Sequence, residues 1–306
     1  MPKDKHSESD DFRYKFLCNT HVRSSTRMTS IDFSAMLREE RLKSRVKKVR
    51  PIFDQHPPLR LSDFKLDPRG VYYIENFISI KEEQSLLDEI YKPSTKDEDK
   101  WVTLTKRRLK NLGGTPHPDG MLSCDMPEYI KQLLKVLSNA HLEVKDVCDI
   151  HDNPSYNQIL LNEYIDGRGI SFHKDGDLYL PVALILNMSS PALIEFRKTP
   201  TSTTEFSVLM KPKSLLIFTD DAYNKYYHGI KDSDFDVVDE SCINMNALAV
   251  GDTIKRNNKR VSLTIRSCPK VLERKFSQHH KEEEARMRSW WLSSISEKAS
   301  KSTEEA

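Results

Sequence analysis

Arg260-Val-Ser-Leu-Thr-Ile-Arg266 alternates polar or charged side chains with apolar ones along its whole length. Because successive side chains of a β-strand point to opposite faces, this pattern predicts a strand with one polar and one apolar face. The polar face carries Ser262 and Thr264 between the two arginines. Two permanently charged guanidinium groups in a segment with the character of a barrel core indicate an anion between them, such as a small dicarboxylate.

Short segments rich in β-forming residues precede this strand, and turn-forming residues separate them. They predict a mixed α+β fold dominated by β-structure, with a double-stranded β-helix, or jelly roll, as its core. Helices flank this core: Ser79-Ile-Lys-Glu82 has the pattern of a capping box, and Pro127 suits the first turn of a second helix. The predicted strands are 158–164, 182–188, 192–197, 206–211, 214–218 and 260–266.

His173 and Asp175 stand two residues apart in Ile170-Ser-Phe-His-Lys-Asp175, so both side chains leave the same face of an extended strand. A second imidazole, His228, follows the apolar run 215–218. Two imidazoles and one carboxylate with open coordination positions are the ligand set of non-haem Fe(II) oxygenases. The tripeptide H-x-D is common by itself, and a single histidine is more often packed or solvated. The adjacent prediction of an anion site therefore gives the metal interpretation its weight.

Asn162 and Tyr164 share one face of the predicted strand 158–164, and both side chains can donate hydrogen bonds to a carboxylate. The motifs N-x-Y, H-x-D, a distal histidine and R-x5-R together resemble the AlkB-type 2-oxoglutarate- and Fe(II)-dependent dioxygenases. The resemblance covers about residues 67–272. Within that family it extends to the branch of the sixth AlkB homologue, on the segments 106–118, 161–164 and 260–266 followed by Pro269.

The resemblance implies Fe(II), 2-oxoglutarate as cosubstrate and O2. Three residues match the iron ligands and catalytic centre: His173, Asp175 and His228. Four match the residues that hold 2-oxoglutarate, Asn162 and Arg266 at its C1 carboxylate and Tyr164 and Arg260 at its C5 carboxylate. Ser262 stands where relatives often carry asparagine, and it can still form a hydrogen bond within the cosubstrate site. Asp177 falls where nucleobase demethylases place an acidic residue near the substrate base.

The activity that the resemblance implies is oxidation of an N-methylated or otherwise modified nucleobase in DNA or RNA, with release of succinate, CO2 and formaldehyde. Lys106-Arg107-Arg108 lies in a stretch rich in glycine and proline, which by the resemblance is a nucleotide-recognition lid. Three cations there would bind phosphates, although three charges on a loop are also typical of a solvated surface. Two alternatives stay open: a protein side-chain hydroxylase or demethylase of the same chemistry, and a nucleic-acid-binding module with little turnover.

Three regions are predicted along the chain. Residues 1–66 form a basic, partly disordered extension with 15 Lys+Arg against 9 Asp+Glu and one possible helix around 33–50. That helix either docks on the core or serves as a nucleic-acid arm or nuclear-localisation patch. Residues 67–270 form the dioxygenase domain, with helices and lid in 67–154 and the jelly roll in 155–270. Residues 271–306 form a charged helix and tail.

Two further segments receive an interpretation from the sequence. The tryptophans of the C-terminal region, Trp290 and Trp291, are expected to pack back on the core, with contact to a partner as the alternative. The insert 231–259 is interpreted as a loop that flanks the mouth of the active site. Its role is left open.

Composition is typical of a protein from a reducing compartment, because the five cysteines are odd in number and lack C-x-x-C spacing. The first residues contain no apolar segment of the kind found in secretory signals. The longest uncharged run, 178–194, contains two prolines, which argues against a membrane span. We therefore expect a monomer of the cytoplasm and nucleus whose partner is DNA or RNA; its protein partners are not predicted.

Overall fold

The computed structural model describes residues 50–93, 100–148, 155–246, 248–272, 282 and 284–294. The chain divides into two units, Met1–Val49 and Arg50–Ala306, and all of the described residues belong to the second. Almost all of the helix predicted around 33–50, and the tail beyond residue 294, therefore lie outside the described residues. Among those described, no helix combines the length and the apolar composition that a membrane crossing requires.

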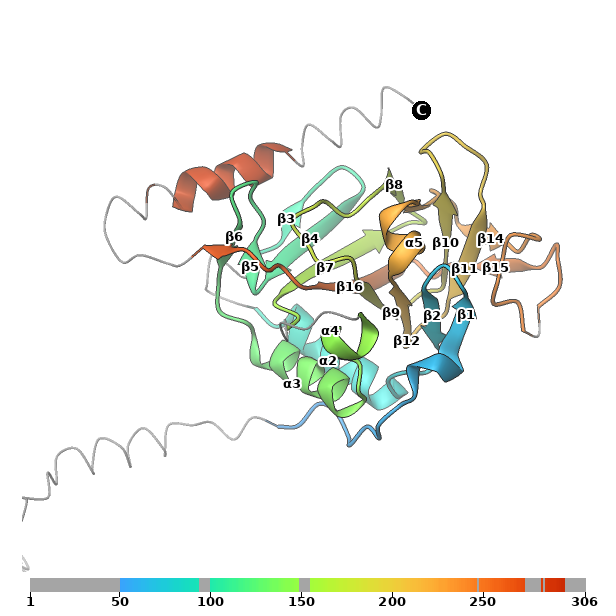
Figure 1. Cartoon of the computed structure of the whole chain (residues 1–306), viewed down its shortest axis with the longest axis horizontal. Helices are drawn as coiled ribbons and strands as arrows, with labels where there is room; N and C mark the ends of the chain where they lie inside the picture. The colour runs from blue at the N-terminus through green and yellow to red at the C-terminus, as the bar shows by residue number, and fades with distance from the viewer. Residues whose placement is uncertain are drawn as a thin grey trace, which may run out of the picture. The chain divides into compact units, whose positions relative to one another are not determined.

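Two antiparallel sheets form the body of the described unit (Figure 1). The larger sheet contains, in spatial order, β1 (Lys65–Asp67), β2 (Val71–Ile74), β12 (Ser214–Phe218), β9 (Ala183–Met188), β16 (Lys259–Arg266), β7 (Gln158–Ile165), β4 (Arg107–Leu112) and β3 (Val102–Thr103). The smaller sheet contains β11 (Phe206–Met210), β10 (Ala192–Arg197), β13 (Tyr227–Ile230) and β8 (Ile170–His173). Side chains from both sheets share one apolar core. The predicted jelly-roll core is thus confirmed.

Helices cover the outer face of the larger sheet. These are α2 (Ile80–Tyr91), α3 (Glu128–Asn139) and the short α4 (Val144–Val147), which lie together in Figure 1. The predicted capping box is present, since Ser79 Oγ accepts from the Glu82 amide at 3.2 Å and Glu82 Oε2 accepts from the Ser79 amide at 2.7 Å. Glu82 also accepts a hydrogen bond from the amide of Asp54. Part of the predicted extension, residues 50–64, therefore packs on this layer.

Strand β16 lies between β9 and β7 near the middle of the larger sheet. Its apolar side chains Val261, Leu263 and Ile265 are fully buried in the core that the sheet shares with the helices. Burial of a side chain of this size stabilises a fold by about 1.5–3 kcal/mol. The alternate, polar side chains of the strand face the space between the two sheets and line a cavity there. The two faces predicted from the alternation are therefore present.

The prediction of helices and a lid for 67–154 is incomplete, because this region also contributes strands. In particular β4 pairs with β7 along its whole length, and β5 (Gly114–Thr115), β6 (Met121–Ser123) and β17 (Val271–Leu272) form a small separate sheet. Charged residues are tolerated in β4 because the neighbouring strand compensates them: Arg108 Nε donates to Glu163 Oε1 at 2.6 Å. The sequence analysis missed this strand because the glycine and proline content of the stretch indicated a loop.

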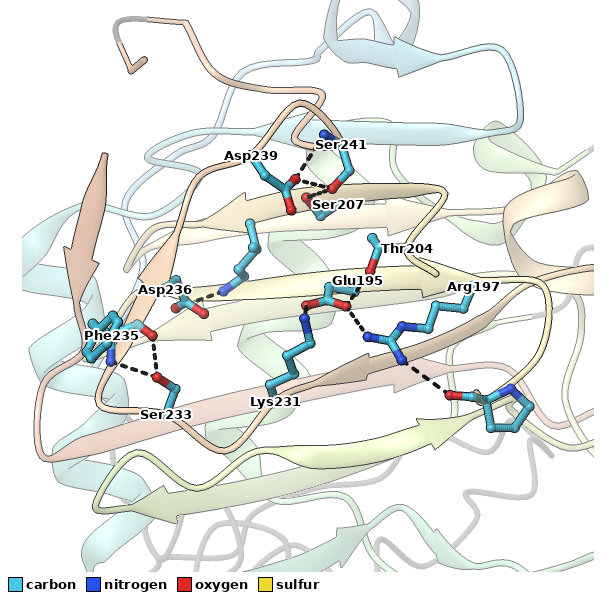
Figure 2. A network of polar contacts seen from close by, with 12 residues as sticks. Glu195, Arg197, Thr204, Ser207, Lys231, Ser233, Phe235, Asp236, Asp239 and Ser241 are labelled. Atoms are coloured by element: carbon cyan, nitrogen blue, oxygen red, sulfur yellow. Dashed lines mark hydrogen bonds and ion pairs between the residues drawn. The ribbon is translucent and has the colours of Figure 1, made fainter. Parts of the chain in front are cut away.

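The insert 231–259 does not mainly flank the mouth of the cavity, as its interpretation as a loop proposed. It forms a hairpin of β14 (Phe235–Val237) and β15 (Thr253–Lys255), and its apolar residues pack against Leu193 and Leu209 of the smaller sheet. Polar contacts join the same surfaces in Figure 2, where Lys231 lies 2.7 Å from Glu195 Oε1. The insert packs there because the outer face of β10 and β11 carries apolar side chains, which are more stable when they are shielded from water.

Candidate active site

Paired strands place the two predicted histidines side by side. His228 on β13 is the register partner of His173 on β8, and the two ring centroids lie 4.4 Å apart. Strand β8 ends at His173, so Asp175 comes from the irregular segment that follows rather than from the strand itself. Nevertheless, a potential ligand atom from each of the three residues lies within 4.8 Å of those from the other two. The structure therefore brings together the predicted metal-binding set.

The protonation states of this cluster suit a metal ion. Burial lowers the pKa of His173, and it lowers the pKa of His228 to about 3, so both imidazoles are neutral at pH 7. Burial by itself would raise the pKa of Asp175, but Arg266, His228 and His173 together outweigh it and hold that pKa below its usual value. Two neutral imidazoles and a carboxylate are the forms that bind a divalent metal ion.

The orientation of His173 is fixed by a backbone group. Its Nδ1 lies 2.8 Å from the carbonyl oxygen of Ser171 and can donate a hydrogen bond to it. The tautomer with the proton on Nδ1 leaves Nε2 with a lone pair for a metal. A metal-bound histidine usually donates its other ring nitrogen in this way, so Ser171 supplies the neighbour that the sequence alone did not identify.

A cavity of about 480 Å³ between the sheets contains the cluster, and the polar face of β16 forms part of its wall. Arg266 lies at the metal end, where its Nη2 is 3.2 Å from Asp175 Oδ1. At the other end of the strand, the guanidinium of Arg260 lies over the ring of Tyr164, 5.2 Å from its centroid. Asn162 and Ser262 line the wall between these two arginines. All five predicted cosubstrate residues therefore line one cavity.

Several buried polar atoms in this wall have no hydrogen-bond partner within the described part of the chain. They include Asp175 Oδ2, Arg266 Nε and Asn162 Oδ1. Buried polar groups are nearly always paired, so a cluster of such atoms in a cavity is typical of a binding site. A carboxylate oxygen beside two imidazoles fits a hard divalent cation, and a guanidinium fits a carboxylate. The residues present thus fit Fe(II) together with a dicarboxylate.

Asn187 is a residue of this site that the sequence analysis missed. Its Oδ1 accepts a hydrogen bond from Arg260 Nε at 2.7 Å. Its Nδ2 faces three backbone carbonyl oxygens, of Ser190 at 2.9 Å and of Met210 and Lys211 at 3.1 Å each, which fixes the orientation of the amide. The only sequence signal is an asparagine at an inward position of the apolar strand 182–188. Asparagine there holds a buried arginine that has a depressed pKa because of its burial.

The predicted substrate residues do not all lie at the cavity. Lys106, Arg107 and Asp177 line it, and Lys106 also forms an ion pair of 2.9 Å with Asp232. Arg108 does not line the cavity, contrary to the prediction. It occupies the opposite face of β4, where it pairs with Glu163 and its guanidinium lies 4.4 Å from the centroid of a Trp101 ring. Alternation along a strand separates neighbours in this way, whereas a loop would have allowed all three cations to converge.

Comparison with known proteins agrees with this geometry, because residues 70–266 match the sequence model of the 2OG-Fe(II) oxygenase superfamily. The chain belongs to this superfamily. It is a 2-oxoglutarate-dependent dioxygenase of the AlkB-like type, an oxidoreductase that uses Fe(II), 2-oxoglutarate and O2.

Relatives of this oxygenase differ in how much of their length it matches. It is 37% identical over 218 residues to "Probable RNA/DNA demethylase ALKBH6" of Danio rerio, covering 67% of this chain and 88% of that protein. It is 25% identical to "Alkylated DNA repair protein ALKBH8 homolog" of Arabidopsis thaliana, covering 68% of this chain and 61% of that protein. Among solved structures, "The structure of OsALKBH1" aligns with a TM-score of 0.41 at 15% identity, covering 64% of this chain and 97% of that one.

Proposed function

We propose that this oxygenase oxidises an N-methyl group on a modified nucleobase in DNA or RNA and releases succinate, CO2 and formaldehyde. The observation that carries the proposal is the position of Lys106 and Arg107 on the wall of the same cavity as the His-Asp-His cluster. Cations beside a buried reaction centre suit a polyanionic substrate whose base enters the cavity. The printed name of the Danio rerio relative, a probable RNA/DNA demethylase, supports the same substrate class.

The roles that we assign to the site residues follow from their positions. His173, Asp175 and His228 would hold Fe(II). Arg266, at the metal end of the cavity, and Asn162, on the wall between the two arginines, would bind the C1 carboxylate of 2-oxoglutarate. At the far end of β16, Arg260 and Tyr164 would bind the C5 carboxylate, with Ser262 as a further hydrogen-bond donor on the wall. When bound, iron and 2-oxoglutarate supply the oxidising chemistry. The protein orients the cosubstrate and shields the reaction from water.

The test of the proposal is succinate formation by iron-loaded protein after oxygen is admitted, with and without a pool of N-methylated oligonucleotides. His173→Ala serves as the blank. Stimulation by the oligonucleotides, with formaldehyde released, would support the nucleic-acid substrate. Turnover that methylated peptides stimulate and oligonucleotides do not would replace it with the protein-modifying alternative. Absence of any turnover above the blank, together with tight oligonucleotide binding, would point to a binding module instead.

Asn187→Ala is expected to raise the apparent KM for 2-oxoglutarate by about 10-fold with a smaller change in kcat. The variant removes the hydrogen bond that holds Arg260 in place, and a hydrogen bond to a charged group contributes about 1.5–3 kcal/mol. The measurement is the 2-oxoglutarate dependence of succinate formation. Ser189→Ala, a half-buried position of the adjoining bend, provides the control. An unchanged KM would show that Arg260 does not depend on this amide.

The corrected orientation of the basic triplet gives a second prediction. Lys106→Ala combined with Arg107→Ala is expected to weaken oligonucleotide binding and to reduce the slope of log K against log salt by about 1–2, since each lost phosphate contact removes about 0.9. The control is Arg108→Ala, which removes one positive charge of the same triplet from the opposite face of β4. Binding is measured at several salt concentrations. Equal losses in both variants would contradict the assignment.

A monomeric state and a location in the cytoplasm and nucleus remain predictions from the sequence.

A further inference from the structure

A C-terminal helix contributes to the wall of the active-site cavity. Residues 284–294 are helical, and Figure 1 draws this segment next to β5 and β6. Two contacts attach it there: Arg288 Nη1 donates to Thr115 Oγ1 at 2.8 Å, and the ring of Trp290 meets the ring of His117 at 4.8 Å in an edge-to-face arrangement. The helix lies beyond residue 266, where the match to the superfamily ends.

The cavity-lining residues of this helix share one face. They are Trp290, Trp291 and Ser294, whose spacing places them on a single side of an α-helix. Trp290 is 43% exposed even though its ring contacts His117. An indole held in position by an edge contact, with its remaining surface open toward a cavity, has the properties of a stacking surface. The sequence alone allowed packing on the core or contact with a partner; the structure shows the packing contact and leaves part of the Trp290 side chain exposed.

We infer that the helix 284–294 is a substrate-binding wall, on which Trp290 and Trp291 stack against a planar heterocyclic base at the mouth of the cavity. This inference rests on the proposed function and adds a specific contact surface to it. Lys106 and Arg107 line the same cavity, so a base on the indoles would have its phosphates within the field of these cations. The jelly roll supplies the reaction centre, and a segment outside the family match supplies part of the substrate-binding surface.

The experiment compares Trp290→Ala/Trp291→Ala with the unchanged protein. The probes are single-stranded DNA and RNA oligonucleotides that carry an N-methylated base. We expect the Kd to rise by about 10-fold or more, because stacking of a base on an aromatic side chain is commonly worth this much. Succinate formation without oligonucleotide is measured in parallel, so that a loss of oligonucleotide affinity is separated from a loss of iron or 2-oxoglutarate binding. Leu292→Ala is the matched control, since Leu292 is exposed on the same helix and does not line the cavity.

Indole fluorescence provides an independent readout. The chain has three tryptophans, and the third, Trp101, lies under Arg108 on the other face of β4. Oligonucleotide should therefore quench the fluorescence of the unchanged protein and leave that of the double variant nearly constant. Trp290→Phe, which keeps an aromatic ring, should retain most of the affinity and guards against a loss caused by misfolding.

The other outcomes discriminate between the two proposals. If the double variant binds the oligonucleotides as tightly as the unchanged protein does, the stacking wall is refuted and the proposed function stands. If it binds more tightly or turns over faster, the helix is an obstructing lid, which also refutes the wall. If the unchanged protein binds no oligonucleotide while it still converts 2-oxoglutarate, the nucleic-acid function fails and the wall fails with it.

Discussion

His173→Ala is expected to lower Fe(II)-dependent succinate formation by more than about 100-fold. The loss of a residue that merely orients a metal ligand costs 10–100-fold, so the loss of a ligand should cost more. Two ligands would remain, His228 and Asp175, and they would hold the metal ion weakly and leave an extra open position. The measurement is metal bound per chain after anaerobic loading, together with turnover of 2-oxoglutarate.

The fold should survive this change, which makes the result interpretable. The His173 side chain makes one hydrogen bond within the described structure, to the carbonyl of Ser171, so its removal should cost about 1–3 kcal/mol of stability. His141→Asn is the control, because His141 is exposed and its φ of 57° suits asparagine. A His173 variant that still binds one iron per chain and turns over normally would show that the cluster is not the metal site.

Arg260→Met is expected to raise the apparent KM for 2-oxoglutarate by at least about 30-fold, the equivalent of the 2 kcal/mol or more that a buried charge pair loses with one partner. Within the described structure no salt bridge joins Arg260 to a carboxylate, and burial lowers the pKa of its guanidinium. The charge is therefore costly for the cosubstrate-free protein. Methionine fills similar space without that cost, so the free energy of unfolding should stay constant or rise while stabilisation by added 2-oxoglutarate is lost.

Arg256→Met provides the contrasting control for this experiment. Arg256 is buried to the same degree as Arg260, but both its Nε and Nη2 donate to the carboxylate of Asp236. Its replacement should lower the free energy of unfolding by about 3–5 kcal/mol, because Asp236 would remain as an unpaired buried charge. The KM for 2-oxoglutarate should not change. A reversal of this pattern between the two arginines would contradict the role assigned to Arg260.

The core strands and the metal-binding set could be predicted because their signals are local. Alternation over Arg260–Arg266 and the H-x-D tripeptide depend only on neighbours in the chain, and both led to residues that line the cavity. The resemblance to a family then supplied the order of the motifs. Strand β7 could be predicted in the same way, since Asn162 and Tyr164 are two residues apart and therefore share one face of a strand.

The predictions that failed have a different cause: they depend on contacts between residues that lie far apart in the sequence. Arg108 belongs to a strand because Glu163, on the neighbouring strand, neutralises it, and no window of sequence around residue 108 contains that glutamate. Asn187 matters because of Arg260, 73 positions away. The insert 231–259 covers Leu193 and Leu209, whose outward orientation the sequence did not reveal. Such contacts are decided by register and topology, which local patterns do not determine.

The strict alternation of β16 also separates the residues that determine stability from those that determine cosubstrate binding. Its odd-numbered residues Val261, Leu263 and Ile265 lie in the core that the sheet shares with the helical layer, while the even-numbered residues face the cosubstrate cavity. Thermostability can therefore be engineered from one side of this strand and cosubstrate preference from the other, with little interference between them. In a comparison of natural variants, drift should follow the same division, with interchange among aliphatic residues on one face and near invariance on the other.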